Sequence, residues 1–278
     1  MTITYSHGAP IYYEVRGQGP AVLFCHGAGS NAATWWQQIP DFCKFFTCIT
    51  YDHRCFGRSA VPQNEFIPMY FADDAIAVLD AAGYERAALI CQSLGGITGL
   101  RFALDHPDRV SAFVSCDSPL GIDHSQMNTN IRKFLLSVPV NEIENRALSS
   151  QFVDQNPSHA YLYSQINQFN PLMHVQEEKS EWAARIVGLF EGDHLVGIST
   201  LAELACPTLF VVGKEDPAVT PAVVRELSQI VKQSEILEIE NAGHSPYFEQ
   251  PELFNMHVLK FLFKHVLHSE SYGASNTK

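Results

Sequence analysis

The sequence predicts an α/β fold, in which a mostly parallel sheet is flanked by helices. Over most of the 278 residues, short apolar segments alternate with helical patterns. Most of these segments are apolar throughout, which is typical of strands covered on both faces of a parallel sheet. The alternation stops at about residue 120 and resumes at about residue 204. Because a stretch of that length is too long for an ordinary loop, it predicts a helical insertion.

Seven segments are predicted as strands because they are short and rich in apolar and β-branched residues. They are Ile11–Arg16, Ala21–Cys25, Thr47–Tyr51, Ala87–Cys91, Val110–Cys116, Thr208–Val212 and Glu235–Ile239. Helical patterns occur at Phe71–Ala82, Ser93–Asp105, Pro221–Val231 and Pro251–His265. Proline is tolerated in a first helical turn, and Gly83 is a typical stop after the first of these helices. In such a sheet the functional residues lie at the carboxyl ends of the strands.

The insertion is predicted to hold short helices and no strand. The candidate helices are Asn128–Leu136, Glu142–Phe152, Ala160–Ile166 and Lys179–Phe190. We therefore expect a first core part at residues 1–119, a helical cap at 120–204 and a second core part at 205–268. The remaining residues, 269–278, are small and polar and are expected to be disordered.

Charge and hydropathy argue against nucleic acid and membrane partners. The chain carries 18 lysine and arginine residues against 30 aspartate and glutamate residues, a net charge of −12. It therefore lacks the cationic surface that a phosphate backbone or an anionic membrane requires. No apolar run approaches the roughly 20 residues of a membrane-spanning helix. The first residues also lack the basic and apolar regions of a signal peptide.

The seven cysteines are expected to be free thiols. Their number is odd, most of them lie within apolar segments, and no two have the spacing Cys-x-x-Cys. This usage is typical of a reducing compartment, so we expect a cytoplasmic location. The spacing also argues against a structural metal, and no cofactor is expected.

The strongest local signal is a strand that runs through a tight turn into a helix, Leu89-Ile90-Cys91-Gln92-Ser93-Leu94-Gly95-Gly96. A serine at such a turn is raised above the sheet edge, as in the nucleophile-elbow motif Gly-x-Ser-x-Gly. The chain has Ser93 and Gly95 in this motif, but Cys91 at the first glycine position. Ser93 is therefore the candidate nucleophile. The alternative is that Ser93 only caps the helix that follows it.

A serine nucleophile needs a base, and histidine is the usual one because it titrates near neutral pH. His244 follows the last predicted strand, at the same sheet edge as Ser93, although a surface-loop histidine is the alternative. The base in turn needs a carboxylate that orients it. Asp216, after strand Thr208–Val212, is the first candidate, and Asp117 and Glu215 are the alternatives.

A glycine-containing loop, Cys25-His26-Gly27-Ala28-Gly29-Ser30, follows an early predicted strand. Glycines in such a loop free backbone N–H groups to face a developing oxyanion. The amides of Ala28 and Leu94 are the candidate pair. A phosphate-binding loop is the alternative, but the Gly-Lys-Ser/Thr ending that it requires is absent from this loop.

Taken in order, these motifs resemble those of the α/β-hydrolase superfamily, and within it the esterase, enol-lactonase and C–C hydrolase branch. They are His26-Gly27-Ala28-Gly29, Asp52-His53-Arg54-Cys55-Phe56-Gly57-Arg58-Ser59, Ser93-Leu94-Gly95-Gly96, Asp216 and Asn241-Ala242-Gly243-His244. The resemblance covers about residues 10–265 and implies an eight-stranded sheet with a helical cap. Two departures are Cys91 and Cys55, each where the family usually has glycine. Asp52, Arg54 and Ser59 are interpreted as structural hydrogen-bonding residues.

The function predicted from these residues is hydrolysis of a small or medium ester or lactone. Ser93, His244 and Asp216 would form the catalytic triad, and the amides of Ala28 and Leu94 would form the oxyanion hole. Trp35, Phe56 and Trp182 are candidate substrate contacts between the sheet and the cap. The alternatives are a non-hydrolytic use of the same triad (C–C cleavage, lyase chemistry, acyl transfer or perhydrolysis) and a ligand receptor with slow turnover.

Overall fold

The computed structural model describes residues 2–137, 142–169, 179–192 and 194–267. The segment predicted to be a disordered tail, residues 269–278, lies outside them. Within the described residues, no helix is both long enough and apolar enough to cross a membrane.

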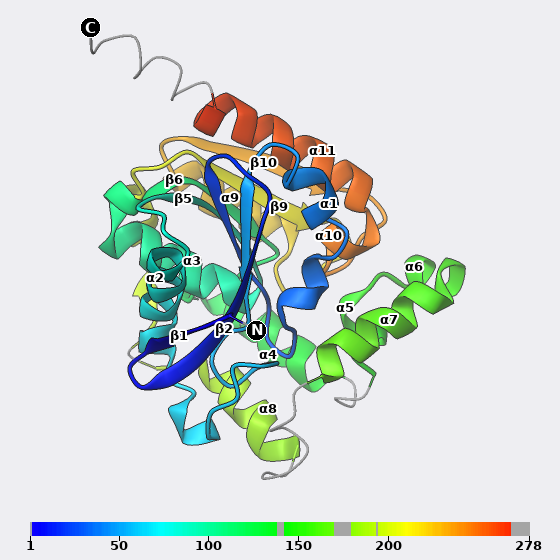
Figure 1. Cartoon of the computed structure of the whole chain (residues 1–278). Coiled ribbons are helices and arrows are strands. Elements are labelled where there is room, and N and C mark those ends of the chain that lie inside the picture. The colour runs from blue at the N-terminus through cyan, green and yellow to red at the C-terminus, as the bar shows by residue number, and fades with distance from the viewer. Residues whose placement is uncertain (1, 138–141, 170–178, 193, 268–278) are drawn as a thin grey trace, which may run out of the picture.

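An eight-stranded sheet forms the centre of the described fold (Figure 1). Its strands are β1 (Thr2–Ser6), β2 (Ala9–Arg16), β3 (Ala21–Cys25), β4 (Thr47–Tyr51), β5 (Ala87–Gln92), β6 (Val110–Cys116), β9 (Thr208–Gly213) and β10 (Ser234–Ile239). They lie in the order β1-β2-β4-β3-β5-β6-β9-β10. Strand β2 is antiparallel to both of its neighbours, and the pairs from β4 to β10 are parallel. The predicted α/β fold with a mostly parallel sheet is confirmed.

Helices cover the two faces of this sheet. They are α1 (Ile39–Phe42), α2 (Phe71–Ala81), α3 (Leu94–Asp105), α9 (Pro221–Ile230), α10 (Pro246–Glu249) and α11 (Pro251–Leu262). Helices α2 and α3 contact each other on one face, and α1 and α11 contact each other on the other (Figure 1). Because both faces are covered, every residue of β3, β4 and β5 is buried. This burial accounts for the mainly apolar and β-branched residues in these three strands.

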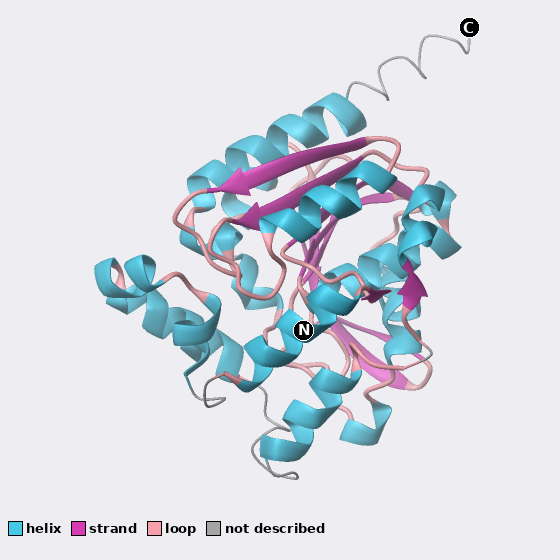
Figure 2. Cartoon of the chain, turned by 180° about the vertical axis from the view of Figure 1, so that it is seen from behind, coloured by secondary structure: helices cyan, strands magenta, loops and turns pink. Residues whose placement is uncertain are grey.

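The segment between β6 and β9 forms a group of helices at one end of the sheet (Figures 1 and 2). These are α4 (Ser125–Leu136), α5 (Ile143–Ala147), α6 (Ser150–Gln155), α7 (Pro157–Gln168) and α8 (Lys179–Gly188). Two short strands, β7 (Ile122–Asp123) and β8 (Val196–Gly197), pair in parallel near the two ends of this segment. The prediction that the insertion holds no strand is therefore wrong.

The prediction of one helix over Glu142–Phe152 is also wrong, because an extended residue divides this stretch into the two helices α5 and α6. Leu148 has φ −103° and ψ 153°, which ends α5, and Ser149 caps α6 by accepting the Phe152 amide. The break frees the carbonyl of Ala147, which accepts the His244 amide over 2.8 Å. The helices between β6 and β9, where the sequence predicts the cap, are thereby joined to the loop that follows β10.

Candidate active site

Ser93 stands at a strained turn between β5 and α3. Its backbone has φ 50° and ψ −116°, a combination that is costly for a non-glycine residue and is concentrated at functional sites. Its side chain makes no capping hydrogen bond to α3, so the interpretation of Ser93 as a helix cap is wrong. The Ser93 carbonyl accepts the Ser118 hydroxyl over 2.6 Å and the Gly96 amide over 3.0 Å. These two bonds hold the turn.

Cys91 occupies the first glycine position of the elbow motif and is completely buried. A Cβ atom at Gly99, on α3, would lie only 2.6 Å from the Cys91 sulfur atom. A Cβ atom at Gly95 would lie 2.2 Å from the Cys25 carbonyl oxygen. Helix α3 therefore packs closely on β3 and β5, and the missing side chain at position 99 leaves the room that the Cys91 thiol needs.

Side chains from three loops meet at Ser93. His244 Nε2 lies 3.0 Å from Ser93 Oγ, and His244 Nδ1 lies 2.9 Å from Asp216 Oδ2. Asp216 Oδ1 accepts the Ala218 amide over 2.7 Å, and both Asp216 and His244 are buried. The carboxylate favours the tautomer with its proton on Nδ1, so Nε2 is left to accept the serine proton. Glu215 is exposed, whereas Asp117 is buried beside Asp216 and His244.

The histidine loop is held by groups that the sequence analysis did not identify. Gln92 Nε2 donates to the His244 carbonyl over 3.0 Å, and the Phe134 ring lies 4.7 Å from the His244 ring. Glu249 accepts the Gly243 amide over 2.8 Å and the Ser149 amide, in the cap, over 2.7 Å. Burial raises the pKa of Glu249, although these amides act in the opposite direction. The sequence signal that could have indicated a buried Glu249 is its position directly after the aromatic pair Tyr247-Phe248.

The loop after β3, which contains Ala28, lies against the elbow. A Cβ atom at Gly27 would be 2.1 Å from Gln92 Oε1 and 3.1 Å from Ser93 Cβ, so any side chain there would displace the Gln92 amide that holds the His244 carbonyl. Leu94 is the first residue of α3, and its N–H therefore has no acceptor within the helix. The structure thus brings the loop of Ala28 and the amide of Leu94 to the same side chain, Ser93.

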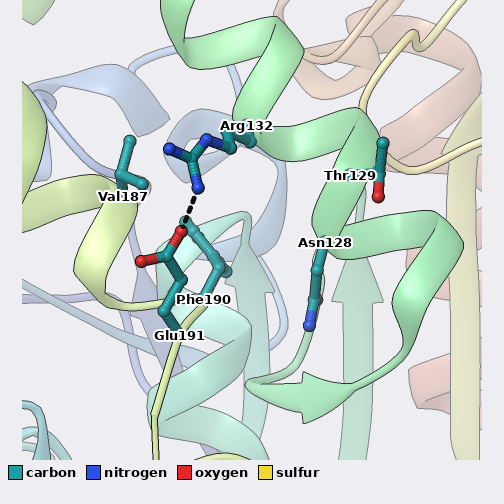
Figure 3. Close-up of a pocket in the computed structure, with 6 residues that line it drawn as sticks. All are labelled: Asn128, Thr129, Arg132, Val187, Phe190 and Glu191. Carbon is teal, nitrogen blue, oxygen red and sulfur yellow. Dashed lines mark hydrogen bonds and ion pairs between the residues drawn. The ribbon is translucent and has the colours of Figure 1, made fainter.

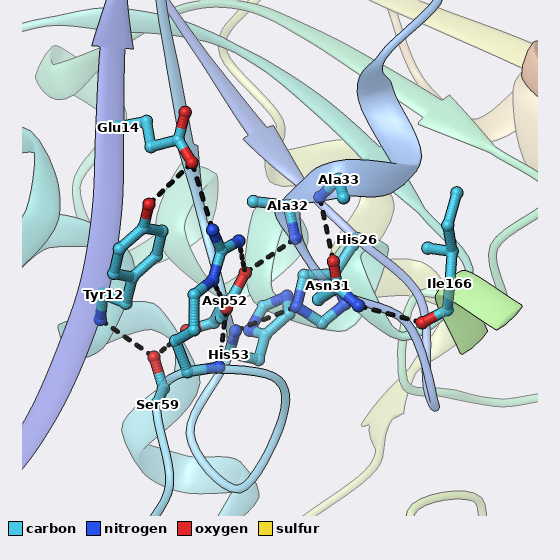
Figure 4. Close-up of polar contacts among 11 residues, drawn as sticks. Tyr12, Glu14, His26, Asn31, Ala32, Ala33, Asp52, His53, Ser59 and Ile166 are labelled. Carbon is cyan, nitrogen blue, oxygen red and sulfur yellow. Dashed lines mark hydrogen bonds and ion pairs between the residues drawn. The ribbon is translucent and has the colours of Figure 1, made fainter. Parts of the chain in front are cut away.

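His26 begins this loop as a neutral, completely buried imidazole (Figure 4). Its Nε2 atom accepts the His53 amide over 2.9 Å, and its Nδ1 atom lies 2.7 Å from the Gly27 carbonyl oxygen. These contacts need one protonated and one bare ring nitrogen, so a doubly protonated ring does not fit. Burial lowers the pKa of His26 from 6.5 to about 4, against the opposing charge of Asp52.

We expect acid to destabilise the fold through His26. Between pH 6.5 and about pH 4 the unfolded chain binds a proton that the folded chain does not. The stabilisation is therefore complete above pH 6.5 and is lost as the pH falls toward 4, by about 3 kcal/mol in total. Urea unfolding at pH 7.5 and pH 5 measures this loss. In His26→Asn the difference between the two pH values should shrink by about 2 kcal/mol. An unchanged difference would contradict the assignment.

Asp52 joins the loops around the site (Figure 4). Its Oδ1 atom accepts the Ala32 amide over 2.7 Å, and its Oδ2 atom accepts the Arg58 amide over 2.7 Å. The Ser59 hydroxyl donates to the Asp52 carbonyl over 2.6 Å. In the same region Asn31 Nδ2 donates to the Ile166 carbonyl, at 2.9 Å, and so connects the loop to α7 of the cap. These bonds support the structural interpretation of Asp52 and Ser59.

Two of the three predicted substrate contacts are buried against other aromatic rings. Trp35 is completely buried, and its ring lies 4.6 Å from that of Tyr247. Phe56 is also completely buried, with its ring 5.7 Å from the His26 ring. Trp182 belongs to α8, but its side chain lies outside the described part of the structure. Their contact with substrate stays a prediction.

A small hollow lies between α4 and α8 in the cap (Figure 3). Its lining residues are Asn128, Thr129, Arg132, Val187, Phe190 and Glu191. Arg132 and Glu191 form an ion pair of 2.7 Å across it, and each is more than half exposed. Its volume of about 160 Å³ is below the roughly 300 Å³ at which small-molecule sites begin. We therefore do not assign it a ligand.

Comparisons with known proteins find relatives that match nearly the whole chain. A putative carbamate hydrolase RutD from Azorhizobium caulinodans is 27% identical over 267 residues, which cover 92% of this chain and 97% of that protein. The 3-oxoadipate enol-lactonase 2 of Acinetobacter baylyi is 26% identical and covers 91% and 92%, respectively. The solved structure of a thermophilic esterase from Thermogutta terrifontis has a TM-score of 0.80 at 25% identity, and the match covers 95% of this chain and 99% of that one.

The family model described as alpha/beta hydrolase fold matches residues 20–251. The match runs from the start of β3 to the beginning of α11 and includes Ser93, Asp216 and His244. Since it spans well over half of the sequence, the chain belongs to the α/β hydrolase fold family.

Proposed function

We propose that the chain is a serine hydrolase that cleaves a small or medium ester or lactone through an acyl-enzyme. One observation carries the proposal. Ser93, His244 and Asp216 form a hydrogen-bonded series with distances of 3.0 and 2.9 Å, and the serine stands on a strained turn. An activated serine nucleophile requires a base within hydrogen-bonding distance and a third group that orients the base.

In the proposed acylation step, His244 Nε2 accepts the Ser93 proton while Ser93 Oγ attacks the carbonyl carbon. The amides of Ala28 and Leu94 stabilise the negative charge that develops on the carbonyl oxygen. His244 then gives the proton to the departing alkoxide, and the acyl group remains on Ser93. Asp216 stays ionised and stabilises the imidazolium.

In the deacylation step, His244 removes a proton from a water molecule whose oxygen adds to the acyl carbon. The tetrahedral intermediate collapses, the acid leaves, and His244 returns the proton to Ser93 Oγ. For a lactone substrate the leaving alkoxide and the acid belong to one product molecule.

The relatives support carbonyl substrates of this kind, since they include an enol-lactonase and an esterase. The similarity to RutD favours a second candidate, a carbamate, because its carbonyl carbon is open to the same attack. The Phe134 ring beside His244 supports an apolar group at the reacting end of the substrate.

The test combines labelling with turnover. The protein is treated with a fluorophosphonate, and its intact mass and Ser93 peptide are measured. Turnover is then followed on p-nitrophenyl esters of increasing acyl length, on γ-lactones and on a phenyl carbamate. We expect one adduct, located on Ser93, and the fastest turnover with short acyl esters or lactones.

The other outcomes discriminate between the alternatives. Turnover of the carbamate alone would move the function to carbamate hydrolysis. An adduct on Ser93 without turnover of any of these substrates would favour a non-hydrolytic use of the triad or a receptor. The absence of an adduct would contradict an activated Ser93.

A further inference from the structure

Asp117 is a second buried carboxylate beside the candidate triad, and the proposed mechanism does not use it. It follows directly after β6, is 1% exposed and has φ 44°, which is rare for a non-glycine residue. Its amide donates to the Val211 carbonyl over 2.9 Å, and its Oδ1 atom accepts the Gly213 amide over 2.9 Å. Asp117 is therefore anchored by both backbone and side chain to β9, the strand that precedes Asp216.

This anchoring brings two carboxylates to one imidazole. A carboxylate oxygen of Asp117, a carboxylate oxygen of Asp216 and a ring nitrogen of His244 all lie within 4.8 Å of one another. His244 Nδ1 contacts Asp216 Oδ2 and Ala218 contacts Asp216 Oδ1, so each Asp216 oxygen already has one partner. On Asp117, Oδ1 accepts the Gly213 amide, so the proton would be on Oδ2, whose remaining lone pair can still accept the Cys116 thiol.

The surroundings of Asp117 determine its charge. The titratable groups that face it are Asp216 and His244 on the loops after β9 and β10, Cys116 on β6 and Tyr163 on α7. The Cys116 thiol donates to Asp117 Oδ2 over 3.3 Å. Two carboxylates buried at one site do not both ionise, because each repels the charge of the other in a medium of low polarity. Burial and the neighbouring Asp216 accordingly raise the pKa of Asp117 well above its usual range.

We propose that Asp117 is a positioning residue that stays protonated and donates its proton in a hydrogen bond to Asp216, so that the pair presents a single negative charge to His244. A second negative charge would stabilise the protonated imidazole, which cannot accept the Ser93 proton. The donated hydrogen bond also fixes the Asp216 carboxylate against His244 Nδ1. This inference rests on the proposed function only for its effect on turnover, because the protonation state of Asp117 can be measured without a substrate.

The first experiment is an infrared difference spectrum of the wild type against Asp117→Asn at pH 8. We expect a protonated carboxyl stretch that is present in the wild type, absent from the variant and shifted in D₂O. The other buried carboxyls, such as Glu249, occur in both proteins and cancel. A carboxylate signal in place of the protonated band would overturn the proposal, whether or not the protein hydrolyses esters.

The second experiment is the pH dependence of kcat/KM for an ester that the wild type cleaves. The side-chain amide introduced by Asp117→Asn still donates to Asp216 and accepts from Gly213, so we expect a loss of at most about threefold and an acid limb that stays in place. Asp117→Ala lacks the donor and should lower kcat by about tenfold with little change in KM.

The acid limb of the pH profile distinguishes a protonated, positioning Asp117 from an ionised one. If Asp117 were ionised in the wild type, Asp117→Asn would remove a negative charge beside His244 and move the acid limb to lower pH, which would overturn the proposal. Full activity in Asp117→Ala would also overturn it. Should Asp117→Ala fail to fold, the infrared signal and the acid limb of Asp117→Asn still decide.

Discussion

Replacement of Ser93 by alanine is expected to lower kcat for ester hydrolysis by about 10⁴-fold or more, with the fold retained. Alanine removes the one oxygen atom that forms the acyl-enzyme, while the hydrogen bonds that hold the turn come from the Ser93 backbone. His244→Ala should lower kcat by a similar factor, because the nucleophile and the base act together and neither is effective without the other. The double variant should then be no slower than either single variant.

The matched control is Ser228→Ala. Ser228 is a buried serine on α9, whose hydroxyl donates to the Arg225 carbonyl over 2.8 Å and takes no part in the site. Its replacement should change kcat by less than about twofold, since a hydroxyl distant from the site affects stability and not turnover. Steady-state kinetics and circular dichroism of the wild type and the four variants test these expectations. If Ser93→Ala kept more than about one hundredth of the activity, Ser93 would not be the nucleophile.

The interior of the fold follows from sequence because burial leaves a clear pattern. Strands β3 and β5 are buried over their whole length, and their sequences are apolar except for Gln92 at the end of β5. Strand β1 leaves a weaker pattern, because it lies at the sheet edge and three of its five residues are exposed. Its signal was instead the turn that follows, where His7 and Gly8 both have positive φ and connect β1 to β2 as a hairpin.

The site was predictable where a reactive side chain follows a strand, and less so elsewhere. Ser93, Asp216 and His244 each follow a strand of the parallel part of the sheet, so their convergence at one edge follows from topology. The choice between Asp216 and Asp117 did not follow, because both come after neighbouring strands. The carbonyl of Ala147 left no signal at all, since a main-chain atom has no residue type, and its contact with His244 depends on the break between α5 and α6.

Removal of the Asp74 carboxylate is expected to destabilise the protein by about 3–5 kcal/mol. Asp74, on α2, and Arg54, in the loop after β4, have completely buried side chains and form two hydrogen bonds of 2.5 and 2.6 Å. Burial raises the pKa of Asp74 even beside this guanidinium, which shows how costly a charge is at this place. In Asp74→Ala the guanidinium of Arg54 stays buried without a counter-charge, and this unpaired charge destabilises the folded state.

The matched control is an exposed ion pair in the same helix. Asp80, at the end of α2, contacts Arg109 with a side chain that is 57% exposed, so Asp80→Ala should cost at most about 1 kcal/mol. Urea unfolding at pH 7 measures both values. The double variant Arg54→Met/Asp74→Leu should recover a large part of the loss, because it leaves no unpaired charge behind. If Asp74→Ala cost no more than Asp80→Ala, the buried pair would not be what fastens the loop of Arg54 to α2. That loop also carries Asp52, which accepts the Ala32 amide. A more mobile loop in Asp74→Ala should therefore also disturb the loop after β3 beside the candidate site.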